Sequence, residues 1–325
     1  MKRIPGYGIF LPTQVNRREF ITISAGTALA ATTDTPRTYT YKTAEGCDIQ
    51  ADVYGAEARA RKPVVIWIHG GALILGSRKS VPAQFKGELL KQGFVVVSID
   101  YRLAPETKLP AIIEDVRDAH RWVRKSGPKL FQIDPDRLAV AGGSAGGYLT
   151  EMSGFAVNPR PRALVSYYGY GDITLPWYSR PDPFYRKQPL VSKEEAMGSV
   201  GKVILSEPAE KNQRGRFYLY CRQQGIWPKE VGGHDPDRES KWFDRYCPIR
   251  NVSAKYPPLM LIHGTEDTDV PYDESKRMDE KLTQIGVKHE FITVTGAGHG
   301  LSGAKPEETA RIAERAVEFV KTHTS

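Results

Sequence analysis

The chain has 325 residues, of which 40% are hydrophobic and 26% are charged, so it can bury a sizeable core. This length fits one domain with a large insertion better than two full domains. The formal net charge is +8, but the basic residues are scattered among acids and form no run of five or six like charges. Composition and charge therefore argue against a protein that binds nucleic acid.

The first 31 residues resemble a bacterial export signal. Arg17 and Arg18 precede a mildly apolar run at 21–31, which contains a small-residue site at 28–30. This order is typical of a twin-arginine leader, and the run is too short for an ordinary membrane-spanning helix. The alternative is an N-terminus that contains two arginines by chance. We expect a periplasmic or secreted protein with no integral membrane segment in the mature chain.

The chain contains three cysteines, which are too few for a disulfide scaffold. They lie at Cys47, Cys221 and Cys247, and no C-x-x-C spacing indicates a metal site. An oxidising compartment would permit one disulfide bond. Cys221 and Cys247 are the candidate pair, because both lie in a segment with little obvious core.

The first predicted elements after the leader are strands. Residues 38–43 and 48–54 alternate polar and apolar side chains, and a turn at 44–46 separates them. This pattern predicts an antiparallel edge hairpin. Residues 63–68 and 94–99 are continuous apolar runs, as in strands that are buried on both faces of a parallel sheet.

Predicted helices alternate with the later strands. Residues 82–92 separate the two apolar runs, and residues 110–125 carry apolar side chains at helical spacing. Further strands are predicted at 138–141, 163–168, 258–263 and 289–294, and further helices at 273–285 and 306–321. Repeated βα units predict an α/β protein with a mostly parallel, doubly wound sheet and right-handed crossovers.

The segment 173–252 interrupts this alternation. It is rich in aromatic residues and has no strand periodicity. Because it lies between two predicted strands, we expect it to leave and rejoin the fold at the carboxyl ends of the strands, where open α/β sheets bind ligands. It is therefore predicted to form a helical or irregular cap.

Ser144 is the candidate nucleophile. It lies in Gly142-Gly-Ser-Ala-Gly146, between a predicted strand and a helix-like segment. This is the G-x-S-x-G nucleophile elbow of α/β-hydrolases, in which small residues allow a tight turn that exposes the serine hydroxyl. A glycine-rich turn with an inert serine is the alternative, so the rest of the sequence must decide.

A catalytic serine needs a base that is oriented by an acid, and α/β-hydrolases place these residues in the order Ser, Asp or Glu, His. Asp267, after the strand at 258–263, is the candidate acid. Asp269 and Glu266 are the alternatives, and a loop whose acids only cap the next helix is another interpretation. His299 lies between two glycines after the last strand and is the candidate base.

Two other histidines are expected to be structural. His120 falls within a predicted amphipathic helix, and His263 ends a predicted strand.

His69-Gly-Gly-Ala72 follows an early buried strand and resembles the H-G-G-G oxyanion loop of lipases and esterases. Backbone N–H groups in such a loop stabilise the negative charge that develops on the substrate oxygen. We assign this role to Gly71 and Ala72, together with Ala145 directly after the nucleophile. The methyl group of Ala72 is expected to narrow the acyl site.

From about residue 60 to 320 the chain resembles an α/β-hydrolase of the bacterial carboxylesterase branch, near hormone-sensitive lipase and feruloyl or acetyl esterases. The resemblance rests on His69-Gly-Gly-Ala72, Asp100-Tyr-Arg-Leu-Ala-Pro-Glu106, Gly142-Gly-Ser-Ala-Gly146, His263-Gly-Thr-Glu-Asp267 and Gly298-His299. It implies hydrolysis of carboxylic esters through an acyl-enzyme, without a cofactor or metal. Relatives of hormone-sensitive lipase typically carry an N-terminal cap, so inferences about their caps do not transfer.

The expected substrate is a small-molecule or carbohydrate ester with a short acyl group and a bulky, polar alcohol, such as an acetylated or feruloylated sugar. In the segment 173–252 the aromatic residues are interspersed with arginines and lysines, unlike the continuous apolar face of an interfacial lid. Flat aromatic faces beside hydrogen-bond donors suit sugar rings. Alternatively, these aromatic residues form the core of the insertion itself.

Two other functions are compatible with the same fold. A peptidase of the prolyl-oligopeptidase type shares the order Ser, Asp, His, but such enzymes usually carry a propeller domain where this chain has only about 60 residues. A non-catalytic binding protein is the second alternative. Such proteins tend to have lost a triad residue, whereas every candidate is present here.

Overall fold

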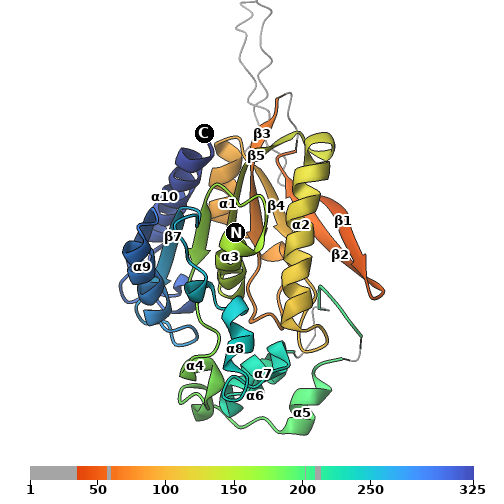
Figure 1. The fold of residues 1–325 in the computed structure, drawn as a ribbon, viewed down its shortest axis with the longest axis vertical. Coiled ribbons are helices and arrows are strands. Elements are labelled where there is room, and N and C mark those ends of the chain that lie inside the picture. The colour runs from red at the N-terminus through yellow and green to blue at the C-terminus, as the bar shows by residue number, and fades with distance from the viewer. Residues whose placement is uncertain (1–34, 57–59, 202, 209–213) are drawn as a thin grey trace, which may run out of the picture. The chain divides into compact units, whose positions relative to one another are not determined.

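The computed structural model describes residues 35–56, 60–201, 203–208 and 214–325 (Figure 1). Their centre is an eight-stranded sheet with the order β1-β2-β4-β3-β5-β6-β7-β8. The strands are β1 (Arg37–Ala44), β2 (Cys47–Tyr54), β3 (Lys62–Ile68), β4 (Val95–Ile99), β5 (Ile133–Gly143), β6 (Leu164–Tyr167), β7 (Leu259–Gly264) and β8 (His289–Val294). β2 pairs antiparallel with β1 and β4, and all other neighbours are parallel. The predicted α/β fold with an antiparallel N-terminal hairpin is confirmed.

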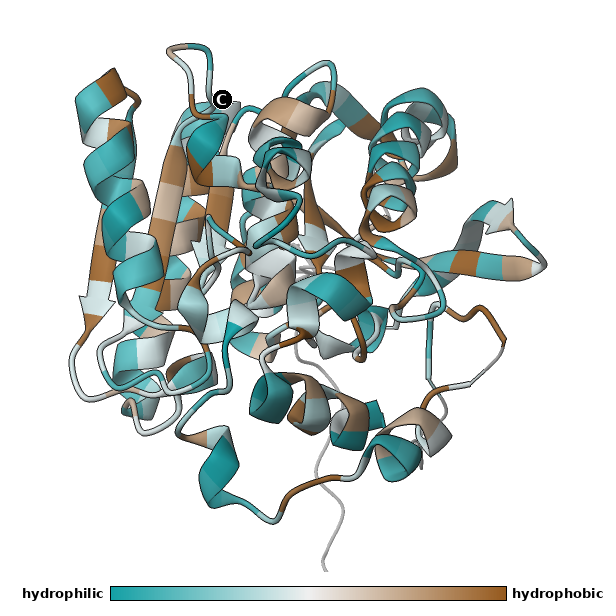
Figure 2. Ribbon diagram, turned by 60° about the horizontal axis from the view of Figure 1, so that its bottom comes forward, coloured by the Kyte–Doolittle hydropathy of each residue, from teal (hydrophilic) through white to brown (hydrophobic). Residues whose placement is uncertain are grey.

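Helices cover both faces of the sheet and bury separate apolar clusters. On one face, α1 (Ala83–Lys91) and α10 (Pro306–Thr324) pack through residues such as Phe85 and Val317. On the other face lie α2 (Leu109–Leu130), α3 (Ala145–Ala156) and α9 (Asp273–Ile285). Figure 2 shows the apolar strands between helices whose outer faces are largely hydrophilic. Apolar residues at helical spacing form these helices because one side of each contacts the sheet.

β5 and α3 begin before the segments expected from the sequence, which were the apolar run at 138–141 and the helix-like segment at 149–155. β5 begins at Ile133 because Lys62 of β3 pairs with Ile133, ahead of a register shift that leads into the apolar part of the strand. α3 begins at Ala145, immediately after the elbow, although its first turns contain glycines that favour helices poorly. Tertiary packing stabilises this turn, since residues 145–154 are all buried.

Between β6 and β7 the described residues form only short helices and loops. These are α4 (Pro176–Ser179), η2 (Tyr185–Lys187), α5 (Lys193–Gly198), α6 (Arg214–Gln224), α7 (Trp227–Gly232), α8 (Ser240–Phe243), η3 (Asp244–Tyr246) and η4 (Pro248–Arg250). We call residues 173–252 the cap. In Figure 1 the helices α4 to α8 gather beyond one end of the sheet. The indole nitrogen of Trp227 donates a hydrogen bond to the carbonyl of Ala72, so this is the end at which β3 leads into the loop at 69–72.

Several aromatic residues of the cap form its own core. Tyr178 stacks on Trp177 at a ring-centroid distance of 3.7 Å and on Trp227 at 4.1 Å. Tyr178, Trp227, Phe217 and Phe243 are almost completely buried. Because these side chains are buried, they do not present the open platforms that a sugar ring would need.

The expected disulfide bond between Cys221 and Cys247 is wrong. Both cysteines are buried as free thiols, as is Cys47. Cys221 lies within α6, while the thiol of Cys247 contacts the carboxylate of Asp172 at 3.4 Å. Shared location in one insertion is thus not enough to bring two sulfur atoms together.

The proposed export leader at 1–31 lies outside the described residues. Within the described part of the chain, no helix is long and apolar enough to cross a membrane.

Candidate active site

Ser144 lies at the sharp turn between β5 and α3. Its backbone adopts φ 56° and ψ −122°, in the positive-φ region that is costly for a residue with a side chain. A Cβ atom on Gly142 would lie 2.3 Å from the carbonyl oxygen of Gly146, and one on Gly146 would lie 2.0 Å from that of Ile68. Only glycine fits at these two positions. The turn is held in place because the N–H of Ser144 donates to the carbonyl of Tyr167 in β6.

The structure brings the three sequence-predicted catalytic residues together. The Nε2 atom of His299 lies 3.1 Å from Oγ of Ser144, and its Nδ1 atom lies 2.7 Å from Oδ2 of Asp267. Asp267 follows β7, and His299 opens the short helix η5 (His299–Leu301) after β8. Because β7 and β8 are parallel neighbours, their carboxyl ends present the acid and the imidazole side by side. This arrangement can transfer a proton from the serine hydroxyl to the imidazole.

Asp267 is held as a carboxylate by several donors. Its Oδ1 atom accepts the backbone N–H groups of Asp269 and Val270 at 2.8 and 2.9 Å. Burial would raise its pKa, but hydrogen bonds from His263 and His299 outweigh burial and hold the pKa well below the usual range. Asp267 therefore stays ionised and can orient the imidazole at neutral pH.

His263 has a role that the sequence pattern did not indicate. It is buried at the end of β7, as expected, but its Nε2 atom lies 3.2 Å from Oδ2 of Asp267 and 3.0 Å from the carbonyl of Val270. Its Nδ1 atom faces the hydroxyl of Ser275 at 2.7 Å. His263 thus holds the carboxylate of Asp267 in position through a second contact to Oδ2, beside that of His299. The spacing of four residues between His263 and Asp267 was the only signal for this contact.

Asp269 is a second carboxylate at the same histidine. Its Oδ2 atom lies 3.4 Å from Nε2 of His299, on the opposite side of the ring from Asp267. The cap holds it, because Tyr185 and Arg222 donate to its Oδ1 atom at 2.8 and 2.6 Å and Tyr218 donates to the same atom. Asp269 therefore does not serve as a helix cap, and α9 begins only at Asp273.

The environment of His299 favours its protonated form. Burial alone would lower its pKa, but the hydrogen bond to Asp267 and the charge of Asp269 outweigh burial and raise the pKa above the ordinary value. Tyr168 packs against the imidazole edge to face, with 5.0 Å between ring centroids. Sequence reasoning missed Tyr168, although its place directly after β6, at the carboxyl end of a central strand, was a usable signal.

The loop at 69–72 runs beside the nucleophile. A Cβ atom on Gly70 would lie 3.2 Å from Cβ of Ser144 and 2.7 Å from the carbonyl oxygen of Gly143. Gly71 and Ala72 have φ values of 106° and 55°, so the loop curls back on itself. Ala145 lies on the other flank of Ser144, as the first residue of α3. The three predicted oxyanion-hole residues thus belong to segments on either side of the serine.

The motif at 100–106 supports this loop. The ring of Tyr101 stacks on His69 at 4.2 Å, and its hydroxyl donates to the carbonyl of His69 at 3.0 Å. Arg78, in η1 (Arg78–Ser80), donates to the carboxylate of Asp100 at 2.6 Å. Burial lowers the pKa of His69 to about 4, so this imidazole is neutral and structural at neutral pH.

The cap is fastened to the same loop. Arg214 of α6 donates to the carbonyl of Ile74 and forms a bidentate ion pair with Glu106 at 2.9 and 2.7 Å. Both side chains of this pair are buried. Together with the bond from Trp227 to Ala72, this contact seats the cap against the oxyanion-loop side of the site.

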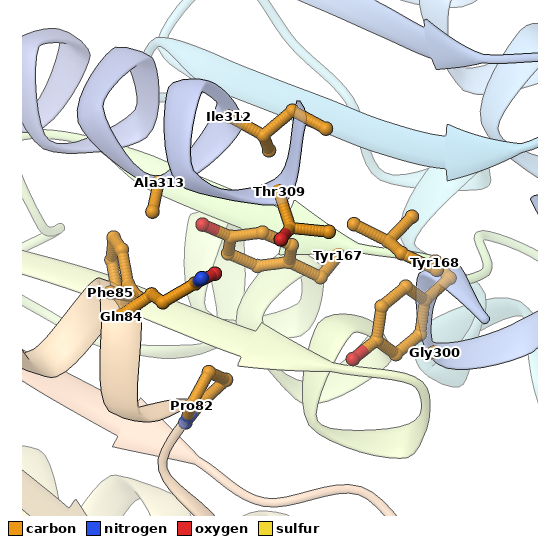
Figure 3. Close-up of a pocket in the computed structure, with 10 residues that line it drawn as sticks. Pro82, Gln84, Phe85, Tyr167, Tyr168, Gly300, Thr309, Ile312 and Ala313 are labelled. Atoms are coloured by element: carbon orange, nitrogen blue, oxygen red, sulfur yellow. The ribbon is translucent and has the colours of Figure 1, made fainter. Parts of the chain in front are cut away.

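A pocket of about 220 Å³ lies beside His299, between α1 and α10 (Figure 3). It is lined by Pro82, Gln84, Phe85, Tyr167, Tyr168, Gly300, Leu301, Thr309, Ile312 and Ala313.

In the part of the chain that the structure describes, no group of three or more His, Cys, Asp or Glu side chains could hold a metal ion.

Two family models match parts of the chain. Residues 51–169 match BD-FAE, and residues 218–325 match the prolyl oligopeptidase family. The first match includes the oxyanion loop and the serine elbow, and the second includes the acid and histidine loops.

The chain is also similar to individual proteins, among them two esterases and a polyketide synthase. Esterase LipC of Mycobacterium tuberculosis is 30% identical over 260 residues, which cover 76% of this chain and 56% of LipC. The non-reducing polyketide synthase ausA of Emericella nidulans is 28% identical over 313 residues, covering 81% of this chain but 13% of the synthase. The chain thus spans about half the length of LipC and a small part of ausA. The solved structure of the Pyrobaculum calidifontis esterase is 26% identical with a TM-score of 0.62, covering 88% of this chain and 84% of that one.

Proposed function

Since this chain belongs to the α/β-hydrolase superfamily, we propose that it is a serine esterase that hydrolyses carboxylic esters through an acyl-enzyme intermediate. The observation that carries the proposal is the chain of contacts from Ser144 through His299 to Asp267. The esterases among its relatives support the same class of reaction.

In the first half of the proposed reaction, Ser144 is the nucleophile. Its hydroxyl proton passes to Nε2 of His299 as Oγ bonds to the ester carbonyl carbon. The carbonyl oxygen becomes an oxyanion, which the backbone N–H groups of Gly71, Ala72 and Ala145 stabilise. The imidazolium, stabilised by Asp267, then gives its proton to the departing alcohol oxygen, and the carbon–oxygen bond breaks.

In the second half, water hydrolyses the acyl-enzyme. His299, neutral again, takes a proton from the water while the water oxygen attacks the acyl carbonyl. The same N–H groups stabilise the second oxyanion. Collapse of this intermediate releases the carboxylic acid, and His299 returns the proton to Oγ of Ser144.

The proposed substrates carry short acyl groups. Ala72 is 5% exposed, and its carbonyl accepts a hydrogen bond from Trp227, whose side chain is completely buried. The cap therefore fills the space beside the oxyanion loop, which leaves little room for a long acyl chain. Of the carbohydrate esters expected from the sequence, this favours the acetylated over the feruloylated sugar as our proposal for the natural substrate, and the twin-arginine leader that we propose at 1–31 supports action in the periplasm or outside the cell.

Substitution of the nucleophile tests the proposal. Ser144→Ala should lower kcat for a short-chain ester by about 10⁴-fold or more, because the covalent step is lost while backbone oxyanion donors remain. The exposed Ser80→Ala is the matched control and should retain wild-type turnover. Circular dichroism should show both variants folded. A folded Ser144→Ala protein that keeps wild-type activity would refute the assignment.

A prolyl-oligopeptidase-type peptidase is the second candidate, because residues 218–325 match that family. The two functions separate when kcat/KM is compared for acetyl, butyryl and dodecanoyl esters of one alcohol and for a proline-containing peptide amide. The esterase proposal expects the acetyl or butyryl ester to react fastest. Faster cleavage of the peptide would favour the peptidase, and a preference for the dodecanoyl ester would contradict a short acyl site.

A further inference from the structure

The pocket between α1 and α10 belongs to the sheet domain and not to the cap. All ten of its lining residues lie outside 173–252. Most of its wall is apolar, and the aromatic part comes from Phe85, Tyr167 and Tyr168. Four polar groups accompany this wall: the amide of Gln84 and the hydroxyls of Thr309, Tyr167 and Tyr168 (Figure 3). An apolar cavity with a few polar groups is the usual form of a small-molecule site.

This pocket shares a wall with the catalytic centre. Gly300 and Leu301, two of its lining residues, directly follow His299. Tyr168, another lining residue, packs edge to face on the imidazole at 5.0 Å. A Cβ atom on Gly143, the residue before the nucleophile, would lie 3.1 Å from the hydroxyl oxygen of Tyr168. A group bound here would therefore contact Tyr168, which packs directly on the imidazole.

The chemistry determines which half of the ester lies on this side. In the proposed reaction His299 hands its proton to the departing alcohol oxygen, so the alcohol must lie next to the imidazole. The cap contacts the oxyanion loop through Trp227 on Ala72, and it reaches the imidazole through Arg222 on Asp269. The pocket adjoins the imidazole through Tyr168 and Gly300, and none of the residues that line it belongs to the cap.

Tyr167 gives the pocket an unused hydrogen-bonding group. Its side chain is buried, and its hydroxyl finds no hydrogen-bond partner among the described residues. Burial raises its pKa, so the hydroxyl keeps its proton and can donate. An unpaired buried hydroxyl destabilises the free protein, and a polar substituent on a ligand would relieve this cost.

We infer that this pocket binds the alcohol part of the substrate, and that this alcohol carries a six-membered ring with a polar substituent, either a sugar or a hydroxylated aryl group. A dry cavity of about 150 Å³ suffices for benzene, so about 220 Å³ accommodates one substituted ring. The inference rests on the proposed esterase function, because the proton transfer from His299 defines the alcohol side.

The first test fills the pocket. Ala313 in α10 lines it, and Ala313→Met would occupy the space that a ring needs. The substrates are methyl acetate, benzyl acetate, 4-hydroxybenzyl acetate and glucose 6-acetate. For each, kcat/KM is divided by the rate constant of alkaline hydrolysis, which corrects for the intrinsic reactivity of the ester. The wild-type protein should prefer at least one ring-bearing ester over methyl acetate by about ten-fold. Ala313→Met should abolish that preference, so that the ring-bearing esters react no faster than methyl acetate.

The control for this variant is Glu314→Met, which changes the exposed neighbour of Ala313 on the same helix and should keep the preference. The benzyl and glucosyl arms show which kind of ring is bound. Equal normalised rates on all four esters in the wild-type protein would overturn the inference. An equal loss on all four esters in Ala313→Met would also overturn it, because it would reflect general damage.

The second test uses the hydroxyl of Tyr167. If it donates to the substituent of the ring, Tyr167→Phe should slow the 4-hydroxybenzyl ester by about five-fold and leave the benzyl ester unchanged. A merely structural hydroxyl would change both esters alike, and that result would contradict the assigned contact.

Direct binding separates this inference from the proposed function. Calorimetry with 4-hydroxybenzyl alcohol and with methyl glucoside should detect binding of at least one to the wild-type chain and to Glu314→Met, but not to Ala313→Met. If no ester is hydrolysed yet this pattern appears, the proposed function fails, and of the inference only the binding of a ring in the pocket holds. If esters are hydrolysed in a Ser144-dependent way but neither alcohol binds and rings give no advantage, the pocket assignment fails alone.

Discussion

His299 is flanked by two carboxylates with different roles. Asp267 accepts the Nδ1 proton, whereas Oδ2 of Asp269 lies near the Nε2 atom that faces Ser144. A neutral imidazole has a lone pair at Nε2, so the nearby carboxylate of Asp269 does not stabilise it. An imidazolium has an N–H group at the same position, and the carboxylate of Asp269 stabilises it. Asp269 therefore favours the charged form of His299, both at rest and during proton transfer.

Asp269→Asn should move the acid limb of the pH profile to lower pH. Activity requires neutral His299, so kcat/KM rises with pH through the pKa of the imidazole, which the structure raises above the ordinary value of about 6.5. Removing the charge of Asp269 lowers this pKa, so a larger fraction of the variant is active in acid. The ratio of kcat/KM at about pH 5.5 to that at about pH 8.5 should increase.

The control for Asp269→Asn is Asp273→Asn, which removes an exposed carboxylate at the start of α9. Its profile should coincide with that of the wild-type protein. An acid limb in Asp269→Asn that stays in place or moves to higher pH would contradict the role given to Asp269.

At the scale of elements, the cap and the oxyanion loop are joined by a buried ion pair. Arg214 of α6 is 1% exposed and satisfies both oxygens of Glu106 as well as the carbonyl of Ile74. Removing one partner of a buried pair leaves an uncompensated charge, which costs more than the pair itself contributes.

Arg214→Met should lower the free energy of unfolding by about 3 kcal/mol, because the buried carboxylate of Glu106 loses its charged partner and keeps only the N–H of Gly201, and the carbonyl of Ile74 loses the guanidinium. Arg216→Met, two residues along the same helix, removes a guanidinium that is 40% exposed and pairs with Glu195. This control should cost less than about 1 kcal/mol. Urea denaturation measures both values, and equal effects for the two variants would show that the buried pair does not anchor the cap.

The strands and the long helices of the sheet domain were predictable because their burial is regular. The bounds expected for α9 and β8 agree with the structure, since helical and strand spacing of apolar residues follows from one buried face. The cap was less predictable. Its described helices span three to eleven residues, too few to display a period, and its order comes from contacts such as Tyr178 on Trp227.

The same contrast holds within the site. Ser144, Asp267 and His299 could be proposed from the sequence because each follows a predicted strand in a short motif. The contact of Asp269 with Nε2 of His299 could not be predicted. The residues that hold Asp269 there, Tyr185 and Arg222, lie 84 and 47 residues away in an irregular segment. The disulfide prediction was wrong for the same reason, since the only evidence for pairing Cys221 with Cys247 was that both belong to that segment.

At the scale of the whole molecule, buried acids should make stability depend on pH. Glu151 of α3 is 1% exposed; one of its oxygens accepts a bond from Ser166, and the other has no partner among the described residues. Burial raises its pKa to about 8. The folded state thus holds a proton that the unfolded chain, with a pKa near 4.5, releases. Its contribution is present below about pH 4.5 and is lost as pH rises towards 8.

Glu151→Gln should remove this dependence. The amide keeps the shape of the protonated acid and needs no ionisation, so the variant should gain stability relative to the wild-type protein as pH rises. The difference in unfolding free energy between the two proteins should grow by about 4 kcal/mol from about pH 4.5 to pH 8. Glu318→Gln, an exposed site on α10, is the control. Parallel stability curves for Glu151→Gln and the wild-type protein would contradict a buried, protonated Glu151.

The account as a whole depends on Ser144 being an activated nucleophile. A fluorophosphonate probe reacts covalently with such a serine, and intact mass followed by peptide mapping locates the adduct. We predict one adduct per chain on Ser144, which is lost in Ser144→Ala and forms much more slowly in His299→Gln. Failure of the folded wild-type protein to react, or an adduct on another residue that persists in Ser144→Ala, would contradict it.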